Sequence, residues 1–389
     1  MESELKDLNS KPPKSNSNGN STNTVRDDRP LLKSNSTSSA AVCSDSLHEM
    51  EKKYAAYVRR DGYGTMGCGE LSVKEKLLLC FALVTLFPVR VILAVNILLL
   101  YYFICRVCTL FYARNRDEEQ EDYGDMSGWR RGVIVACGRV LSRAMLFIFG
   151  FYWIVDSSFN HNFATQKEDK HQPEEMGRAG VIISNHVSYL DILYHMSSSF
   201  PSFVAKKSVS KLPFVGLISK CLGCVYVQRE SKSSDSKGVS AIVTERIKEA
   251  HQNKSAPLMM LFPEGTTTNG DFLLPFKTGG FLAREPVLPV ILKYHYQRFS
   301  PAWDSISGVR HVILLLCQFV NYMEVIRLPV YYPSQQEKDD PKLYANNVRR
   351  LMASEGNLVL TDIGLAEKRI YHAALNGNSL PTVLHPKDE

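Results

Sequence analysis

A nearly uncharged apolar run, Leu77–Ile104, is the feature that most restricts how this chain can fold. Pro88 and Arg90 interrupt it, and the piece on either side of them is shorter than the ~20 residues that a membrane-spanning helix needs. One continuous helix would place Arg90 near the middle of a bilayer, at a cost of about 2.5–3.5 kcal/mol. The run therefore predicts a membrane segment within residues 75–112, either a helical hairpin or a single helix that starts near Arg90.

A second apolar segment, residues 129–155, contains four arginines and ends with the aromatic residues Phe151, Tyr152 and Trp153. This pattern is typical of an amphipathic helix that lies along a membrane interface. A core helix of a globular domain is the alternative. Basic residues flank the run Leu77–Ile104 on both sides, which mildly favours two cytosolic ends.

Residues 1–45 are mostly Ser, Asn, Thr and Lys, with few apolar side chains. Such a composition cannot bury enough apolar surface to offset the entropy lost on ordering, so we predict a disordered polar tail. The chain does not begin with the basic and apolar stretch of a signal peptide, which favours reduced cysteines that face the cytosol.

Charge and cysteine spacing limit the partners. The net charge of +6 suits a surface beside anionic lipid, but it is too diffuse to indicate nucleic acid. Two cysteine pairs, Cys105/Cys108 and Cys221/Cys224, have the spacing of zinc ligands. Apolar residues surround both pairs, so we expect no metal; palmitoylation of the first pair is a minor alternative.

Residues 176–355 alternate short apolar runs with amphipathic stretches, which predicts an α/β domain with a mixed sheet flanked by helices. The predicted strands are Val181–Ser184, Ser202–Lys206, Val225–Gln228, Pro257–Phe262, Val287–Leu292 and Met323–Tyr331. One helix is expected around Val239–Ile247 and another after Asp340 and Pro341, which are suited to open a helix. Residues 356–389 form a C-terminal tail without a clear pattern.

A histidine and an aspartate five residues apart, His186 and Asp191, follow the predicted strand Val181–Ser184. An alcohol attacks a thioester slowly until a base takes its proton, and neutral imidazole suits that task near pH 7. We therefore predict His186 as a general base and Asp191 as the carboxylate that orients it. Five residues within one helix would point apart by about 140°, so His186 is expected in the strand-to-helix turn and Asp191 in the first turns of the helix.

Two further blocks follow predicted strands. Arg229 has a side chain that can hold a phosphate through paired hydrogen bonds. Glu264 and Gly265 form a turn in which the glycine allows close approach of the backbone to an anion, and the glutamate could orient Arg229 or a substrate group. Each block alone has an ordinary structural explanation, but together with the histidine they predict acyl transfer to a phosphorylated alcohol.

The ordered blocks, completed by Val287-Leu288-Pro289-Val290, resemble the glycerolipid acyltransferase family that carries the Asn-His-x4-Asp signature. Within it the chain most closely resembles the plant lysophosphatidylethanolamine/lysophosphatidylcholine acyltransferases, over residues 75–355. The resemblance implies that His186 and Asp191 are catalytic and that acyl-CoA is contacted near Pro289. The residues implied to bind the glycerophosphate of the acceptor are Gly223, Arg229, Glu264 and Gly265.

The implied activity is that of an acyl-CoA:lysophospholipid acyltransferase acting on the sn-2 hydroxyl. Acyl-CoA is then a co-substrate, no other cofactor or metal is expected, and the partners are the lysophospholipid and membrane lipids, without nucleic acid. The resemblance also implies an endoplasmic-reticulum membrane protein, and the cytosolic acyl-CoA donor implies a catalytic domain facing the cytosol. Three alternatives stay open at this point: a 1-acylglycerol 3-phosphate acceptor, a CoA-independent transacylase and an inactive membrane scaffold.

Overall fold

The computed structural model describes residues 48–112, 115–117, 120–124, 126–158, 178–227 and 234–376. The predicted polar tail and Arg229 lie outside these ranges. The chain divides into two units, Met1–His48 and Glu49–Glu389, and the architecture below is that of the second unit.

Two apolar helices stand near the start of this unit. They are α2, Val73–Val84, and α3, Leu86–Thr109, and they meet at Thr85. The break precedes Pro88, which lies in the first turn of α3, where a proline is tolerated because its missing N–H would have no partner within the helix. The apolar run is therefore divided into a short and a long helix, and the long helix begins before Arg90.

Arg90 is buried and is not exposed to lipid, in spite of its place in an apolar helix. Its guanidinium donates to carbonyl oxygens at and just after the C-terminal end of α8, Gly308–Leu316. The acceptors are Leu316 at 3.0 Å, Phe319 at 3.0 Å, and Gln318. Because the last carbonyls of a helix lack donors within the helix, a cation at this end satisfies them and complements the helix dipole.

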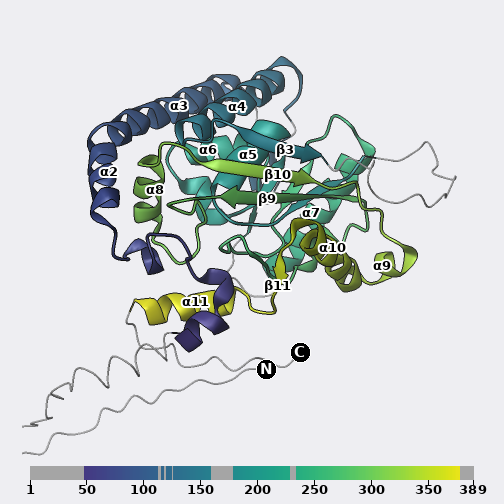
Figure 1. Cartoon of the computed structure of the whole chain (residues 1–389). Helices are drawn as coiled ribbons and strands as arrows, with labels where there is room; N and C mark the ends of the chain where they lie inside the picture. Colours follow the sequence, from purple (N-terminus) through teal and green to yellow (C-terminus); the bar gives the residue numbers. More distant parts are fainter. Residues whose placement is uncertain are drawn as a thin grey trace, which may run out of the picture. The chain divides into compact units, whose positions relative to one another are not determined.

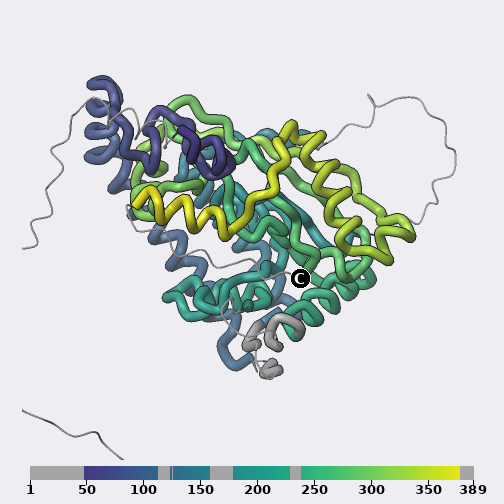
Figure 2. The backbone as a smooth tube through the Cα atoms, turned by 90° about the horizontal axis from the view of Figure 1, so that it is seen from below, coloured from purple at the N-terminus to yellow at the C-terminus, as the bar shows by residue number. Residues whose placement is uncertain are grey.

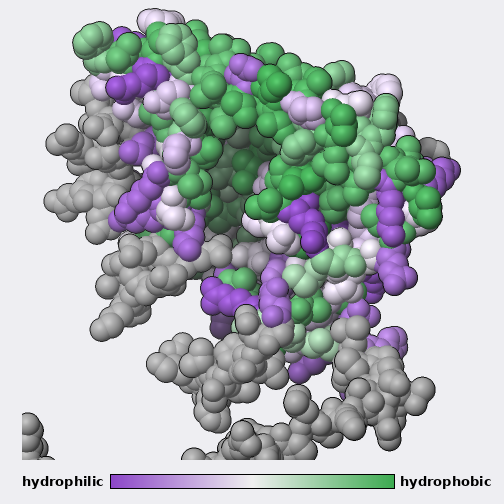
Figure 3. Space-filling model, turned by 90° about the vertical axis from the view of Figure 1, so that its left-hand side faces the viewer, coloured by the Kyte–Doolittle hydropathy of each residue, from purple (hydrophilic) through white to green (hydrophobic). Residues whose placement is uncertain are grey.

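The rest of α3 presents apolar side chains outward. Only 17% of its most apolar 18-residue window is buried, and among the described residues it is the one helix long and apolar enough to cross a membrane. The side of the molecule that carries α2 and α8 shows a wide apolar surface with a hollow in it (Figure 3). An outward apolar face of this extent indicates association with a membrane.

The predicted interface helix is shorter than expected. Helix α4, Gly128–Ile148, lies beside α3 (Figure 1). It buries Ile134 and Leu146, yet exposes Val140 and Phe147. One face of the helix therefore packs in the core, and a membrane interface along the other face stays a prediction. The residues that follow form strand β3, Ile154–Ser158, because they pair with a strand distant in the sequence.

Within the described chain, seven strands form one sheet in the order β3-β10-β9-β4-β7-β5-β6. Neighbours from β9 to β6 are parallel, whereas β10 is antiparallel to β9, so the predicted mixed sheet is confirmed. Besides β3, its strands are β4 Val181–Ser184, β5 Ser202–Lys206, β6 Val225–Val227, β7 Met259–Leu261, β9 Val287–His295 and β10 Tyr322–Arg327.

Helices cover both faces of this sheet. Because successive side chains of a strand point to opposite faces, neighbouring residues of β4 join different core clusters. Ile182 of β4 joins a core cluster with α5, Leu190–Ser198, and α6, Val215–Cys221. Val181 and Ile183 join a second cluster on the other face. That cluster includes α7, Ser234–Gln252, and α10, Pro341–Gly356, which begins with the predicted Asp340 cap.

Segments outside residues 75–355 also belong to the packed domain. The predicted C-terminal tail contains β11, Val359–Leu360, which pairs with β8, Phe272–Leu273, and helix α11, Leu365–Leu375. Tyr371 of α11 is buried, and its ring lies 5.5 Å from that of Tyr54. Figure 2 shows this N-terminal segment, in purple, beside the yellow α11. The remaining short elements are β1 Asn115–Asp117, β2 Gln120–Asp122 and α9 Gln335–Asp339.

Candidate active site

His186 and Asp191 meet at the carboxyl end of β4. His186 lies two residues beyond the strand, and Asp191 is the second residue of α5. The imidazole Nδ1 is 2.9 Å from Asp191 Oδ2; the histidine side chain is 19% exposed and the aspartate is fully buried. This is the strand-turn-helix placement expected from the spacing. With Nδ1 engaged, Nε2 is the ring nitrogen available to a substrate.

The Asp191 carboxylate is held by three further donors. Its Oδ2 accepts the backbone N–H groups of Val187 at 2.7 Å and Ser188 at 2.9 Å. Its Oδ1 accepts the hydroxyl of Tyr294 at 2.5 Å. Burial and the nearby Asp191 raise the pKa of Tyr294, which keeps this hydroxyl protonated as a donor. Asp191 therefore has a fixed orientation, helped by its place at a helix N-terminus.

Tyr294 was not predicted from the sequence. It lies near the end of β9, more than one hundred residues after Asp191, and no spacing rule connects the two. The one available signal is a polar hydroxyl that follows the apolar stretch of a predicted strand. Such a signal does not indicate which turn the hydroxyl will reach.

Glu264 holds the backbone of the same turn. It is 3% exposed, and its two oxygens accept the backbone N–H groups of His186 at 2.7 Å and Leu274 at 2.9 Å. Burial raises the pKa of the Glu264 carboxyl to about 8, although both N–H donors act in the opposite direction. The carboxylate thus faces backbone amides, and its predicted contact with the acceptor stays a prediction.

Two other residues hold the histidine turn in place. The ring of Phe262 stacks on the imidazole of His186, with centroids 4.0 Å apart and planes inclined by 16°. The side-chain amide of Asn185 bonds both backbone groups of Leu292, at 2.8 and 2.9 Å. The turn is therefore tied to β9 as well as to α5.

Gly265 lies beside a basic group that the sequence did not reveal. Its φ of +71° is one that glycine adopts without strain, and a Cβ added here would lie 2.6 Å from Lys277 Nζ. The N–H of Lys277 donates to Pro263 O at 3.0 Å, which brings the lysine back to the turn. Eleven residues, which include β8, separate Lys277 from Gly265, so no local motif indicated it. An ammonium group beside a glycine turn can attract an anion.

The structure does not bring Gly223 or Pro289 to the histidine. By register, Gly223 is level with the first residue of β4, five residues before His186, or roughly 16 Å along the strand. Pro289 is buried opposite Ile183, three residues before the histidine. Arg229 follows β6 but lies outside the described residues. The binding roles of these three residues stay predictions.

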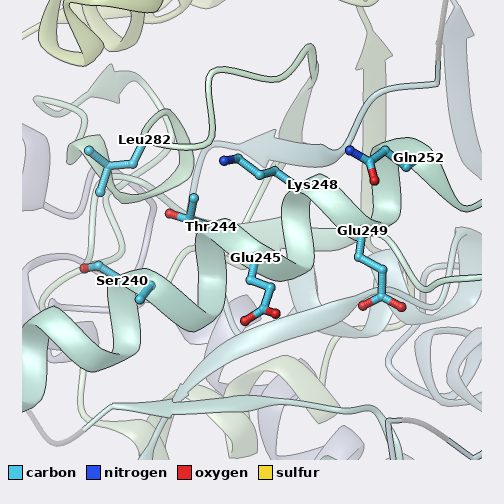
Figure 4. A pocket seen from close by; sticks show the side chains of 8 residues that line it. Ser240, Thr244, Glu245, Lys248, Glu249, Gln252 and Leu282 are labelled. Carbon is cyan, nitrogen blue, oxygen red and sulfur yellow. The ribbon is translucent and has the colours of Figure 1, made fainter.

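The described residues contain no group of three or more His, Cys, Asp or Glu side chains that could hold a metal ion. A shallow depression on the outer face of α7, seen in Figure 4, is lined by Ser240, Thr244 and Lys248 among others. It includes no residue of the β4–α5 turn, and we assign no function to it.

A histidine with a buried aspartate at the carboxyl edge of an α/β sheet is an arrangement suited to general base catalysis. Comparison with known proteins agrees. A family model described as Acyltransferase matches residues 162–293. The lysophospholipid acyltransferase LPEAT1 of Arabidopsis thaliana is 62% identical over the full length of both chains. The chain therefore belongs to the Acyltransferase family and is an acyltransferase, which confirms the resemblance inferred from the blocks.

More distant relatives match part of the chain. Lysophosphatidylcholine acyltransferase 1 of Danio rerio is 33% identical over 74% of this chain, which spans about half (52%) of that relative. The solved structure of a 1-acyl-sn-glycerophosphate acyltransferase from Thermotoga maritima is 18% identical and gives a TM-score of 0.35. It covers 68% of this chain and 98% of the solved one.

Proposed function

We propose that this acyltransferase moves a fatty acyl group from acyl-CoA to the free sn-2 hydroxyl of a lysophospholipid such as lysophosphatidylethanolamine or lysophosphatidylcholine. The observation that carries the proposal is the 2.9 Å contact between His186 Nδ1 and the buried Asp191 Oδ2. The names of the Arabidopsis and zebrafish relatives support the class of acceptor.

In the proposed mechanism, neutral His186 is the general base. Its Nε2 takes the proton of the lysophospholipid hydroxyl while the hydroxyl oxygen attacks the thioester carbonyl carbon. Asp191 keeps the proton on Nδ1 and stabilises the imidazolium. When the tetrahedral intermediate collapses, the carbon–sulfur bond breaks, and the leaving sulfur of CoA takes the proton from Nε2. The ester is formed and the imidazole is neutral again.

The acceptor phosphate is assigned to the Gly265 turn. The Lys277 ammonium lies against this turn. Arg229 follows β6, whose carboxyl end lies at the same edge of the sheet as that of β4, because the intervening strands are parallel. The guanidinium of arginine and the ammonium of lysine are both groups suited to bind a phosphate monoanion.

The membrane supplies the acceptor in this proposal. The outward apolar face of α3 embeds the enzyme in the bilayer that holds the lysophospholipid. Acyl-CoA carries charged phosphates that do not cross a bilayer unaided, so we place the catalytic domain on the cytosolic side, at the endoplasmic reticulum. Protease added to intact microsomes should therefore cut loops after residue 160, and complete protection until detergent is added would contradict this placement.

The decisive experiment is acyl-CoA turnover by membranes across a panel of lysophospholipids, with lysophosphatidic acid included. His186→Ala should lower turnover by at least the ~10²–10⁴-fold typical of a lost general base. His251→Ala is the matched control, since His251 also faces a carboxylate, that of Glu285 at 3.5 Å, but belongs to α7. Near-normal turnover by His186→Ala would exclude the mechanism, and use of lysophosphatidic acid alone would exclude the acceptor.

Lys277→Met tests the acceptor site. A charge-assisted hydrogen bond contributes about 1.5–3 kcal/mol, so kcat/KM for the lysophospholipid should fall roughly 10- to 100-fold. The KM for acyl-CoA should change little. Lys248→Met, on the outer face of α7, is the control for loss of one charge. A change confined to acyl-CoA would show that the two pockets are assigned the wrong way round.

A further inference from the structure

A buried lysine outside the matched acyltransferase region contacts the loop that follows Gly265. Lys368 of α11 is 8% exposed. Its Nζ lies 2.7 Å from the carbonyl oxygen of Thr267, 2.7 Å from Thr267 Oγ1 and 3.3 Å from the carbonyl oxygen of Trp303. An ammonium has three donor hydrogens, so these three acceptors engage all of them. One side chain thus joins two loops that are distant in the sequence.

The same two loops hold the backbone of the histidine turn. The N–H of Thr268 donates to His186 O at 3.0 Å, and the N–H of Trp303 donates to Val187 O at 2.9 Å. The Thr267 hydroxyl also donates to Trp303 O at 2.5 Å, which couples one loop to the other. The carbonyl groups of His186 and Val187 are therefore held by Thr268 and Trp303. Trp303 itself accepts from Lys368, and Thr268 directly follows Thr267, which also accepts from Lys368.

Helix α11 is itself anchored, so Lys368 has a defined position. The Tyr57 hydroxyl donates to Gly364 O at 2.7 Å, just before α11 begins. The Lys368 Nζ lies 5.5 Å from the centre of the Tyr57 ring. His372, one turn further, contacts Asp304 O at 3.2 Å. Burial lowers the pKa of Lys368 to about 8, whereas Asp304 and Glu264 act to raise it.

We infer that Lys368 is a positioning residue for acyl transfer. It joins the Thr267 and Trp303 loops and thereby holds the His186 imidazole in the orientation in which Nε2 reaches the acceptor hydroxyl. This inference rests on the proposed function, in which His186 is the base. Lys368 touches no substrate in this account and acts only through the two loops.

The test compares two full-length variants in membranes. Lys368→Met keeps most of the length of the side chain but removes its donors, and Arg369→Met removes the same charge from the neighbouring, exposed position. Because a small misplacement of a catalytic group is costly, Lys368→Met should lower kcat about 10- to 100-fold, while KM for both substrates stays within about twofold. Arg369→Met should behave like the unsubstituted enzyme.

A double-mutant cycle between Lys368 and Thr267 distinguishes a positioning role from a general loss of stability. Thr267→Val removes one acceptor of Lys368, so the double variant Thr267→Val/Lys368→Met should lose less than the product of the two single losses. If the two losses multiply, Lys368 does not act through Thr267. If kcat per folded molecule is normal in Lys368→Met and only the amount of folded protein falls, the role is structural and the inference is overturned.

A chemical readout works without acyl transfer. Diethylpyrocarbonate modifies accessible imidazoles, and peptide mass spectrometry can follow His186 alone. Lys368→Met should change the modification rate of His186 about threefold or more, because loosening of the loops opens the turn locally, and Arg369→Met should not. An unchanged rate in Lys368→Met overturns the inference whether or not turnover is detected. Loss of the proposed function is read separately, from His186→Ala.

Discussion

The histidine turn and helix α3 differ in where their side chains find contacts. In the turn, the polar groups of His186, Asp191 and Glu264 are bonded to the protein itself. Helix α3 turns large apolar side chains outward and buries its one interior cation, Arg90, against carbonyl groups. The chemistry of the turn is therefore set by contacts within the fold. The stability of the outer face of α3 depends instead on what surrounds the protein, because its apolar side chains are exposed. Substitutions in the two regions should differ accordingly.

The largest effect is expected in the turn. Asp191→Asn keeps the shape of the side chain but no longer fixes the tautomer of His186, so kcat should fall by about 10³–10⁴-fold. Asp340→Asn is a matched control, because Asp340 is likewise an aspartate at a helix N-terminus that accepts a backbone N–H, that of Lys342 at 2.9 Å. That control should cost at most about 1 kcal/mol of stability and leave kcat unchanged. Equal losses in both variants would mean that Asp191 has only a structural role at the start of α5.

Arg90→Met should act on stability and not on chemistry. It removes a buried cation from several carbonyl acceptors, so the free energy of unfolding should fall by about 2–5 kcal/mol, with turnover per folded molecule retained. Thermal denaturation in detergent measures the first quantity and an active-fraction assay the second. Arg106→Met, at an exposed position of the same helix, controls for the lost charge. Normal stability with lost turnover would place Arg90 in the site instead.

Leu100→Asp tests whether lipid covers α3. Leu100 is 50% exposed, and a carboxylate in hydrocarbon costs about 2.5–3.5 kcal/mol. The variant should be released from membranes by alkaline carbonate more readily than the unsubstituted chain. Ala241→Asp, on the exposed surface of α7, should leave extraction unchanged. Equal extraction of both variants would mean that another segment provides the attachment.

The turn should also show a pH dependence of stability. Burial raises the pKa of Glu264 from 4.5 to about 8, so between these values the folded state binds a proton that the unfolded state has released. Stability should then fall as pH rises through this window, by at most about 1.4 kcal/mol per pH unit. Glu264→Gln cannot titrate and should lack this slope, while the exposed control Glu249→Gln should keep it. An identical slope in Glu264→Gln would assign the dependence to another group.

Much of the sheet was predictable because its strands are continuous apolar runs. The bounds of β4 and β5 agree with the sequence, and the helix after Asp340 begins at its predicted cap. The first two residues of β3 were predicted as the end of a helix, whereas they belong to a strand that pairs with β10. Helix α11 was not predicted, and its buried Tyr371 packs with an N-terminal segment around Tyr54 that is distant in the sequence.

The sequence by itself determined the apolar character of α3 and the His186–Asp191 pair, because each depends on residues within one contiguous segment. Hydropathy, helical period and the five-residue spacing are local properties that a linear sequence displays directly. Only the tertiary structure decided what Arg90 caps, what Glu264 accepts and which hydroxyl reaches Asp191. Those contacts join segments far apart in the chain, and they depend on strand order and register, which no local spacing records.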